Sequence, residues 1–165
     1  MTRENLMAAS RAVPPMVSLS YRDLVVEAFV HATESPEKVE RAVAVFAPGA
    51  RIERQELGGH FGQPLTLLHA REKEPEAIAA SLAIVKSAVG REVARTAARR
   101  IDRDLTLHLR FDKQAAVAGK MRLEGGRAND IVKLEVRLRG SRLTAEQAIA
   151  LVEREFGGAI AAEEE

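Results

Sequence analysis

Two kinds of hydrophobic pattern alternate along the chain. Apolar and polar residues take turns, as in half-buried strands, in LVVEAFVHA (24–32), DLTLHLRF (104–111), KMRLE (120–124) and DIVKLEVRLR (130–139). Two shorter strands are expected at RIERQEL (51–57) and PLTLLHAR (64–71). In the three C-terminal segments the leucines, valines, methionine and phenylalanine share one face, and the charged residues share the other. This alternation is typical of an antiparallel sheet with one face covered by helices and one face in water.

Helical spacing of apolar residues occupies the intervals between these strands. Ser35 and Pro36 are expected to start a helix that stops at Pro48-Gly49, and Glu74-Pro75 opens a second helix that Gly90 interrupts. Beyond the glycine, the helical pattern continues through 91–101 and places Arg91, Arg95 and Arg99 on one outward stripe. A last helix begins after Thr144 and is expected to end at Gly157-Gly158.

The element order is therefore β-α-β-β-α(α)-β-β-β-α, which predicts an α+β two-layer sandwich with helices on one face of an antiparallel sheet. The chain of 165 residues is long enough for a single domain, which we place at 22–157. Residues 1–21 are expected to form a flexible arm, with Met16 as an alternative translation start. Residues 158–165 are expected to form an acidic, solvated tail.

Composition narrows the classes of protein that fit. No cysteine is present, so disulfides, thiolate zinc sites and cysteine nucleophiles are excluded. No apolar run approaches the ~18 residues that a membrane span needs, and the N-terminus has no secretory pattern. The expected location is the cytoplasm.

Positive charge is concentrated in one stretch of the chain. Residues 91–142 contain 14 Lys and Arg against 7 Asp and Glu, a local charge of +7, whereas the whole chain carries +1. The outward faces of the three C-terminal strands sum to a platform of Arg110, Lys120, Arg122, Lys133, Arg137 and Arg139. This platform is either a phosphate-binding surface or the ordinary charged face of a half-exposed sheet. These faces carry no aromatic residue, which favours backbone contacts over base stacking.

The segment RFDKQAAVAGK (110–120) ends the first of these three strands. Asp112 is expected to cap a short helical turn that Gly119 terminates, and Lys113 and Gln114 then project from its first turn, where backbone N–H groups favour anions. The alternative is that this turn is a packing element.

Other chemistry is poorly represented in the sequence. Each of the four histidines lies in a different predicted element, and no two of them have the spacing of metal ligands, so no metal and no cofactor is predicted. No paired carboxylates, nucleophile with a base, or glycine-rich phosphate loop is present, so the chain is not predicted to be an enzyme.

Four stretches, FVHATESPEKV (29–39), GGHFGQP (58–64), LHLRFDKQAAVAGK (107–120) and NDIVKLEVRL (129–138), resemble an archaeal family described as predicted RNA-binding proteins or predicted exosome subunits. The resemblance spans about residues 22 to 156. It implies a fold similar to that of the large-subunit ribosomal protein that binds 5S rRNA, and it implies association with RNA. In the GHxGNP loop of that family, Gln63 replaces the asparagine here.

We therefore predict a non-catalytic RNA-binding protein, with an RNA-processing complex or the exosome and a second copy of the chain as further partners, and no membrane partner. The alternative is a protein-interaction module or homodimeric adaptor without direct RNA contact. The predicted RNA-binding residues are Arg110, Lys113, Gln114, Lys120, Arg122, Lys133, Arg137, His31, His60, Arg91, Arg95 and Arg99.

Overall fold

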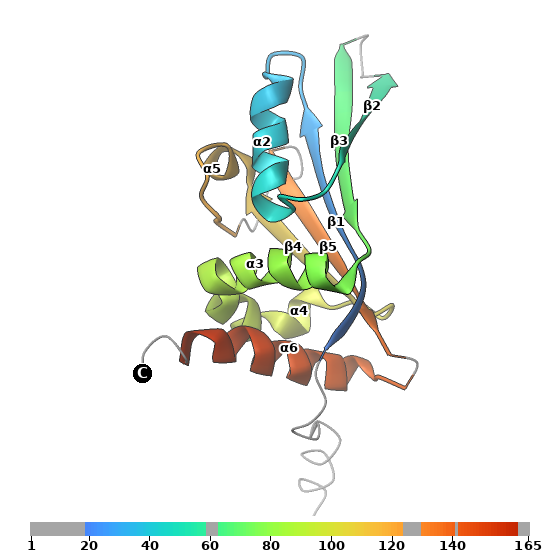
Figure 1. The fold of residues 1–165 in the computed structure, drawn as a ribbon, viewed down its shortest axis with the longest axis vertical. Helices are drawn as coiled ribbons and strands as arrows, with labels where there is room; N and C mark the ends of the chain where they lie inside the picture. The colour runs from blue at the N-terminus through green and yellow to red at the C-terminus, as the bar shows by residue number, and fades with distance from the viewer. Residues whose placement is uncertain (1–18, 59–62, 124–129, 141, 162–165) are drawn as a thin grey trace, which may run out of the picture.

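The computed structural model describes residues 19–58, 63–123, 130–140 and 142–161 (Figure 1). The elements in chain order are β1 (Ser20–Val30), α2 (Pro36–Phe46), β2 (Ile52–Gly58), β3 (Pro64–Glu72), α3 (Pro75–Arg95), α4 (Ala97–Arg100), β4 (Thr106–Asp112), α5 (Lys113–Val117), β5 (Ile131–Arg139) and α6 (Ala145–Ala161). The predicted α+β class is confirmed.

The five strands form one antiparallel sheet in the order β2-β3-β1-β5-β4. β1 lies at its centre, between β3 and β5, and β4 is an edge strand. Because side chains alternate along each strand, one face receives the leucines and valines and the other face receives the charged residues. The strand boundaries agree with the sequence pattern within a few residues, and β1 begins at Ser20, four residues before the predicted start.

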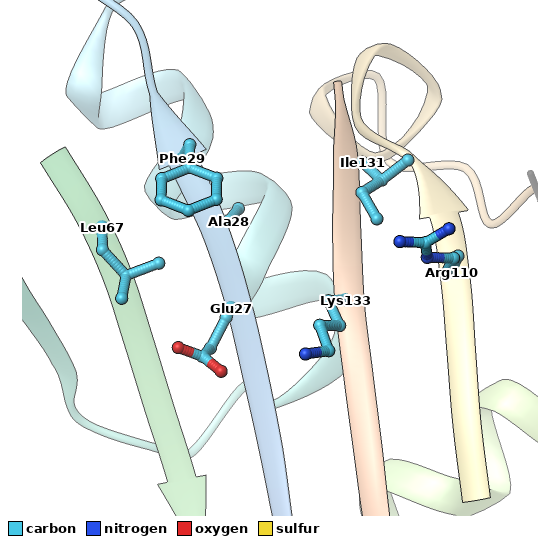
Figure 2. Close-up of a pocket in the computed structure, with 7 residues that line it drawn as sticks. All are labelled: Glu27, Ala28, Phe29, Leu67, Arg110, Ile131 and Lys133. Atoms are coloured by element: carbon cyan, nitrogen blue, oxygen red, sulfur yellow. The ribbon is translucent and has the colours of Figure 1, made fainter. Parts of the chain in front are cut away.

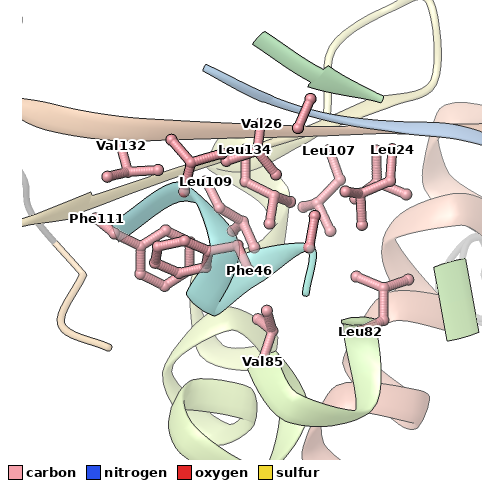
Figure 3. Packing of buried hydrophobic residues seen from close by; sticks show 14 of the residues in the cluster. Leu24, Val26, Phe46, Leu82, Val85, Leu107, Leu109, Phe111, Val132 and Leu134 are labelled. Atoms are coloured by element: carbon pink, nitrogen blue, oxygen red, sulfur yellow. The ribbon is translucent and has the colours of Figure 1, made fainter. Parts of the chain in front are cut away.

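The helices cover the apolar face. α2 and α3 contact β1, and α6 packs on α3 as a further layer (Figure 1). Figure 3 shows the strand residues meeting Phe46, Leu82 and Val85 from the helices, all of them fully buried. The rings of Phe46 and Phe111 lie 4.4 Å apart between centroids and join α2 to β4. Burial of this apolar surface is the main force that holds the two layers together.

The predicted helix starts are confirmed by their capping contacts. Ser35 accepts a hydrogen bond from the N–H of Lys38, with Pro36 in the first turn of α2. Thr144 and Gln147 exchange side-chain and backbone hydrogen bonds at 3.1 Å in each direction, which is a capping box at the start of α6.

Three elements differ from the sequence expectation. In place of the strand predicted at 120–124, the described residues 120–123 form an isolated bridge from Leu123 to Phe111. α6 continues through the two glycines to Ala161, and it packs on α3, where a Cβ at Gly157 would lie 3.4 Å from the Cβ of Ala94. The helix predicted over 91–101 is divided at Thr96 into α3 and α4.

A glycine allows the close contact between α3 and α6. α3 has a non-helical φ/ψ at Val89, and Gly90 follows it. A Cβ at Gly90 would lie 2.5 Å from the backbone oxygen of Phe156, closer than atoms can approach. The kink at Val89 therefore bends α3 without ending it, and the missing side chain of Gly90 lets the backbone of α6 approach.

Candidate nucleic-acid interface

The side chain of Lys113 is buried where α5 meets the end of β1. Its Nζ donates hydrogen bonds to the backbone carbonyl of Phe29 at 3.0 Å and to Glu34 Oε1 at 2.7 Å. The exposed fraction of the side chain is 0%. A buried ammonium is tolerated when it is paired and hydrogen-bonded, and both conditions hold here. The prediction that Lys113 projects into solvent is therefore wrong.

The reason is the direction of α5, which starts immediately after β4. Asp112 caps the helix as predicted, because its Oδ1 accepts a 3.0 Å hydrogen bond from the N–H of Ala115. Lys113 and Ala116 are three residues apart and so share the buried side of the helix. Gln114 lies on the exposed side, where its Nε2 donates to Asp130 Oδ1 at 3.2 Å.

Two of the sequence motifs form one structural unit through Glu34. Besides its bond from Lys113, Glu34 Oε1 accepts a hydrogen bond from the N–H of His31 at 3.1 Å, and the Glu34 N–H donates to the His31 carbonyl at 2.9 Å. His31 itself is 41% exposed beside this turn, with Nε2 4.0 Å from Glu34 Oε1. His60 lies outside the described residues. Of the third motif, 58–64, the structure describes Gly58 and Pro64, which are the last register pair of the β2–β3 hairpin.

The face of the sheet that the helices leave open to solvent, which we call the wet face, contains a buried carboxylate, Asp23, that is only 1% exposed. Arg137 and Arg71 both donate hydrogen bonds to it from the flanking strands β5 and β3. The hydrogen bonds from Arg137 hold the pKa of Asp23 below its ordinary value, against the effect of burial, and Arg71 lowers it further. Arg137 is thus held by Asp23. The charge reversal Arg137→Glu would therefore disturb the fold as well as any RNA contact, because it places a second carboxylate beside Asp23.

A second group of charges on this face centres on His108. Its Nε2 lies 2.7 Å from Asp102 Oδ2, and its Nδ1 lies 3.3 Å from Glu135 Oε1. The hydrogen bond with His108 lowers the pKa of Asp102. Lys133 also pairs with Glu135, at 2.8 Å. Part of the predicted platform is therefore neutralised by its own carboxylates, as the interpretation of an ordinary charged face expects.

Four exposed cations near the edge strand β4 differ from Arg137 and Lys133, whose side chains pair with carboxylates. We call them the β4-edge cations: Arg99, Arg110, Lys120 and Arg122. Within the described residues, none of their side chains forms an ion pair or a hydrogen bond of the kind that Arg137 forms with Asp23. Arg99 and Arg110 line one hollow with His108, of ≈ 310 Å³. Arg122 is held beside the end of β4, because its carbonyl accepts a 2.8 Å hydrogen bond from the N–H of Asp112.

The predicted arginine stripe is not continuous. Arg91 and Arg95 are exposed on the last turns of α3, whereas Arg99 belongs to α4. The break occurs at Thr96, whose Oγ1 donates to the carbonyl of Glu92 at 2.7 Å and accepts from Arg100 Nε at 2.6 Å. Local side-chain bonding of this kind competes with continued helix. Among the described residues that line the hollow beside β4, Arg99 is the one member of this stripe.

An aromatic side chain, Phe29, lines a hollow that Arg110 also lines. Phe29, Leu67 and Ile131 line a hollow with Glu27, Lys133 and Arg110 (Figure 2). The alternation in 24–32 already placed Phe29 on the wet side, opposite Val30. The missing information was the strand order, which sets β1 directly beside β5.

Other kinds of site find no support in the described part of the chain. Residues 19–58, 63–123, 130–140 and 142–161 contain no group of three or more His, Asp or Glu side chains placed to hold a metal ion. Over those same residues, no helix has the length and apolar character needed to cross a bilayer.

Comparison with known proteins yields relatives over most of the chain. RNA-binding protein PAB1135 of Pyrococcus abyssi is 26% identical over 144 residues, which cover 81% of this chain and 92% of that protein. The structure of Mth689, a DUF54 protein from Methanothermobacter thermautotrophicus, superimposes with a TM-score of 0.72 at 26% identity, covering 82% of this chain and 97% of the other. AF2318 from Archaeglobus fulgidus gives a TM-score of 0.70 at 28% identity, with 82% and 99% covered.

A family model described as RNA binding matches residues 23–138. The matched segment includes most of the central strand β1, the edge strand β4 with Arg110, and the buried Lys113. The segment covers most of the domain, from Asp23 to Leu138 near the end of β5. The chain belongs to this RNA-binding family.

Proposed function

We propose that the protein binds RNA without catalysing a reaction on it, and that the β4-edge cations contact the sugar-phosphate backbone. The observation that carries the proposal is Arg110. Its side chain is exposed and lies where two hollows of the wet face meet. Among the described residues it has no carboxylate partner like that of Arg137. A guanidinium in this situation is available for the two-pronged contact that arginine makes with phosphate.

The surrounding charges support the same surface. Arg99 shares a hollow with Arg110, and Arg122 is fixed beside the end of β4. Because β4 is the edge strand, these side chains lie along a border of the sheet that a nucleic-acid strand can approach from the side. Gln114 and His31 lie at the same end of the sheet and are candidates for polar contacts to sugar or phosphate oxygens.

The salt dependence of binding tests this proposal. Each phosphate contact contributes about 0.7–0.9 to the slope of log affinity against log salt. Arg110→Ala should reduce that slope by about this amount and weaken binding at ~50 mM salt. The matched control is Arg41→Ala, which removes an exposed arginine from α2, on the helix-covered side of the sheet. If Arg110→Ala and Arg41→Ala have the wild-type slope, the β4 edge is not the RNA-binding surface.

The finer parts of the sequence prediction, an RNA-processing complex or exosome as partner and a similarity to the 5S-rRNA-binding ribosomal protein, stay predictions supported by the resemblance alone. A homodimer or protein adaptor also stays a prediction. Measurement of the molecular mass in solution at low and high salt, with and without RNA, separates self-association from RNA binding.

A further inference from the structure

The hollow around Phe29 combines apolar, acidic and basic side chains on the solvent-facing side of the sheet. Phe29, Leu67 and Ile131 contribute apolar surface from β1, β3 and β5. Glu27 contributes a carboxylate, and Lys133 and Arg110 contribute positive charge at the β4 side (Figure 2). The volume is ≈ 270 Å³, near the lower limit of ~300 Å³ for small-molecule sites.

This combination suits a ligand with a flat apolar body, a polar edge and a negative charge on one side. In Figure 2, the ring of Phe29 lies between Leu67 and Ile131, with Glu27 and Lys133 further along their strands and Arg110 beyond Ile131. Phe29 is only partly buried, although the residues before and after it in β1 are buried in the core. Aromatic side chains in such positions are the platforms on which unpaired bases stack.

We infer that the hollow holds the base of one unpaired nucleotide, stacked on Phe29, with the adjoining phosphate on Arg110. The inference rests on the proposed function, because Arg110 serves both the hollow and the β4 edge. It also names the class of RNA, which is single-stranded or has an unpaired loop or end. Bases within a duplex are stacked on each other and cannot enter the hollow.

Glu27 gives the hollow a means of choosing among bases. In the described part of the chain, the one ion pair of Glu27 is with His69, where Oε2 lies 3.5 Å from Nδ1. Glu27 also lines the hollow, so its carboxylate can accept hydrogen bonds from a base bound there. A carboxylate accepts hydrogen bonds and donates none, so it favours a base edge with adjacent N–H donors. Guanine presents such an edge through its ring N–H and its exocyclic amino group.

The test measures the affinity of short RNAs by fluorescence anisotropy at ~50 mM salt. The probes are a uridine decamer with one central guanosine, the same strand with inosine in that place, and a duplex of equal length. Inosine lacks the exocyclic amino group and is otherwise the same. The variants are Phe29→Leu, which keeps an apolar side chain but removes the ring, and Glu27→Gln. The control is Ile84→Ala, which removes a 40%-exposed apolar side chain from α3.

We expect Phe29→Leu to weaken binding of the guanosine strand by about fivefold or more, the lower end for a stacked base, and to leave duplex binding unchanged. Wild type should prefer guanosine to inosine, and Glu27→Gln should lose that preference. Circular dichroism and melting check that each variant is folded, and the guanosine preference of the wild type needs no variant at all.

The outcomes separate the two proposals. If no RNA binds to the wild type, the proposed function fails and the inference fails with it. If all the RNAs bind and Arg110→Ala weakens them, but Phe29→Leu binds the guanosine strand as wild type does, the inference alone is overturned. Equal wild-type affinity for guanosine and inosine strands overturns the role assigned to Glu27.

Discussion

Replacement of Lys113 by Met distinguishes a structural lysine from an RNA contact. Met retains most of the apolar stem and removes the charge, so the change isolates the hydrogen bonds made by Nζ. These are the bond to the Phe29 carbonyl at 3.0 Å and the ion pair with Glu34 at 2.7 Å. Asp130 Oδ1 lies further away, at 3.4 Å, and is 58% exposed, so it adds little.

The expected loss of stability follows from the burial of the two partners. Removing one member of a fully buried ion pair costs about 3–5 kcal/mol. Glu34 is 20% exposed, so water can solvate its carboxylate in part and reduce that cost. We expect the free energy of unfolding to fall by about 2–3 kcal/mol in Lys113→Met. For a domain of this size, that is a decrease in Tm of about 4–12 °C.

Urea unfolding and the salt dependence of RNA binding, measured on the same variant, test this reasoning. A double-mutant cycle with Glu34→Gln should return a coupling energy of roughly 1–2 kcal/mol, because both changes remove the same ion pair. The salt slope should equal that of the wild type, since no phosphate-contacting charge is lost. A loss of stability below ~0.5 kcal/mol, or a slope reduced as in Arg110→Ala, would refute the structural role.

Three further predictions concern the helices and the buried carboxylate. Asp112→Ala removes the cap of α5 and should lower the free energy of unfolding in urea by about 1 kcal/mol. RNA affinity in the anisotropy assay should equal that of the wild type or rise slightly, and a clear loss of affinity would assign Asp112 to the RNA contacts. Gly90→Ala should destabilise the protein by at least ~1 kcal/mol, because the new Cβ would meet the Phe156 backbone at 2.5 Å, and an unchanged melting temperature would contradict the close packing. The folded-state pKa of Asp23 is lowered, chiefly by Arg137, so the ionised carboxylate stabilises the fold above the unfolded pKa, and this stability is lost as the pH falls below about 4. Urea midpoints measured from neutral to acid pH should therefore fall less in Asp23→Asn than in the wild type. Parallel pH profiles of the two proteins would be inconsistent with this role.

The elements of the fold could be predicted because their signals are local. The alternation in DLTLHLRF and KLEVRLR directs Leu109 and Leu134 to the core, and both are fully buried. The caps at Ser35 and Asp112 depend on hydrogen bonds that reach only three residues along the chain. The division of the helix at Thr96 was missed because the apolar spacing of 91–101 is that of a continuous helix.

The site could be predicted only in part, because its geometry depends on contacts between distant segments. Lys113 finds its partners 84 and 79 residues away, at Phe29 and Glu34, and no local pattern reports such a distance. Arg137 looked equivalent to Arg110 in the sequence, since both alternate with core residues. The strand order then set Arg137 beside Asp23 and left Arg110 at the edge, where it forms no ion pair with a described carboxylate of the kind that Arg137 forms with Asp23.

The buried lysine and the apolar hollow are connected through one residue. The register of β1 with β5 ends at the pair Ala28 and Val132, and the carbonyl of the next residue, Phe29, is bonded by Lys113. The same Phe29 presents its ring to the hollow on the wet face. The ammonium therefore fixes the backbone of β1 at the point where its ladder with β5 stops, and with it the direction of the ring. If the hollow holds a base as we inferred, Lys113 contributes to RNA binding by holding Phe29 in place, so Lys113→Met should weaken single-strand binding while the salt slope and duplex binding stay at wild-type values.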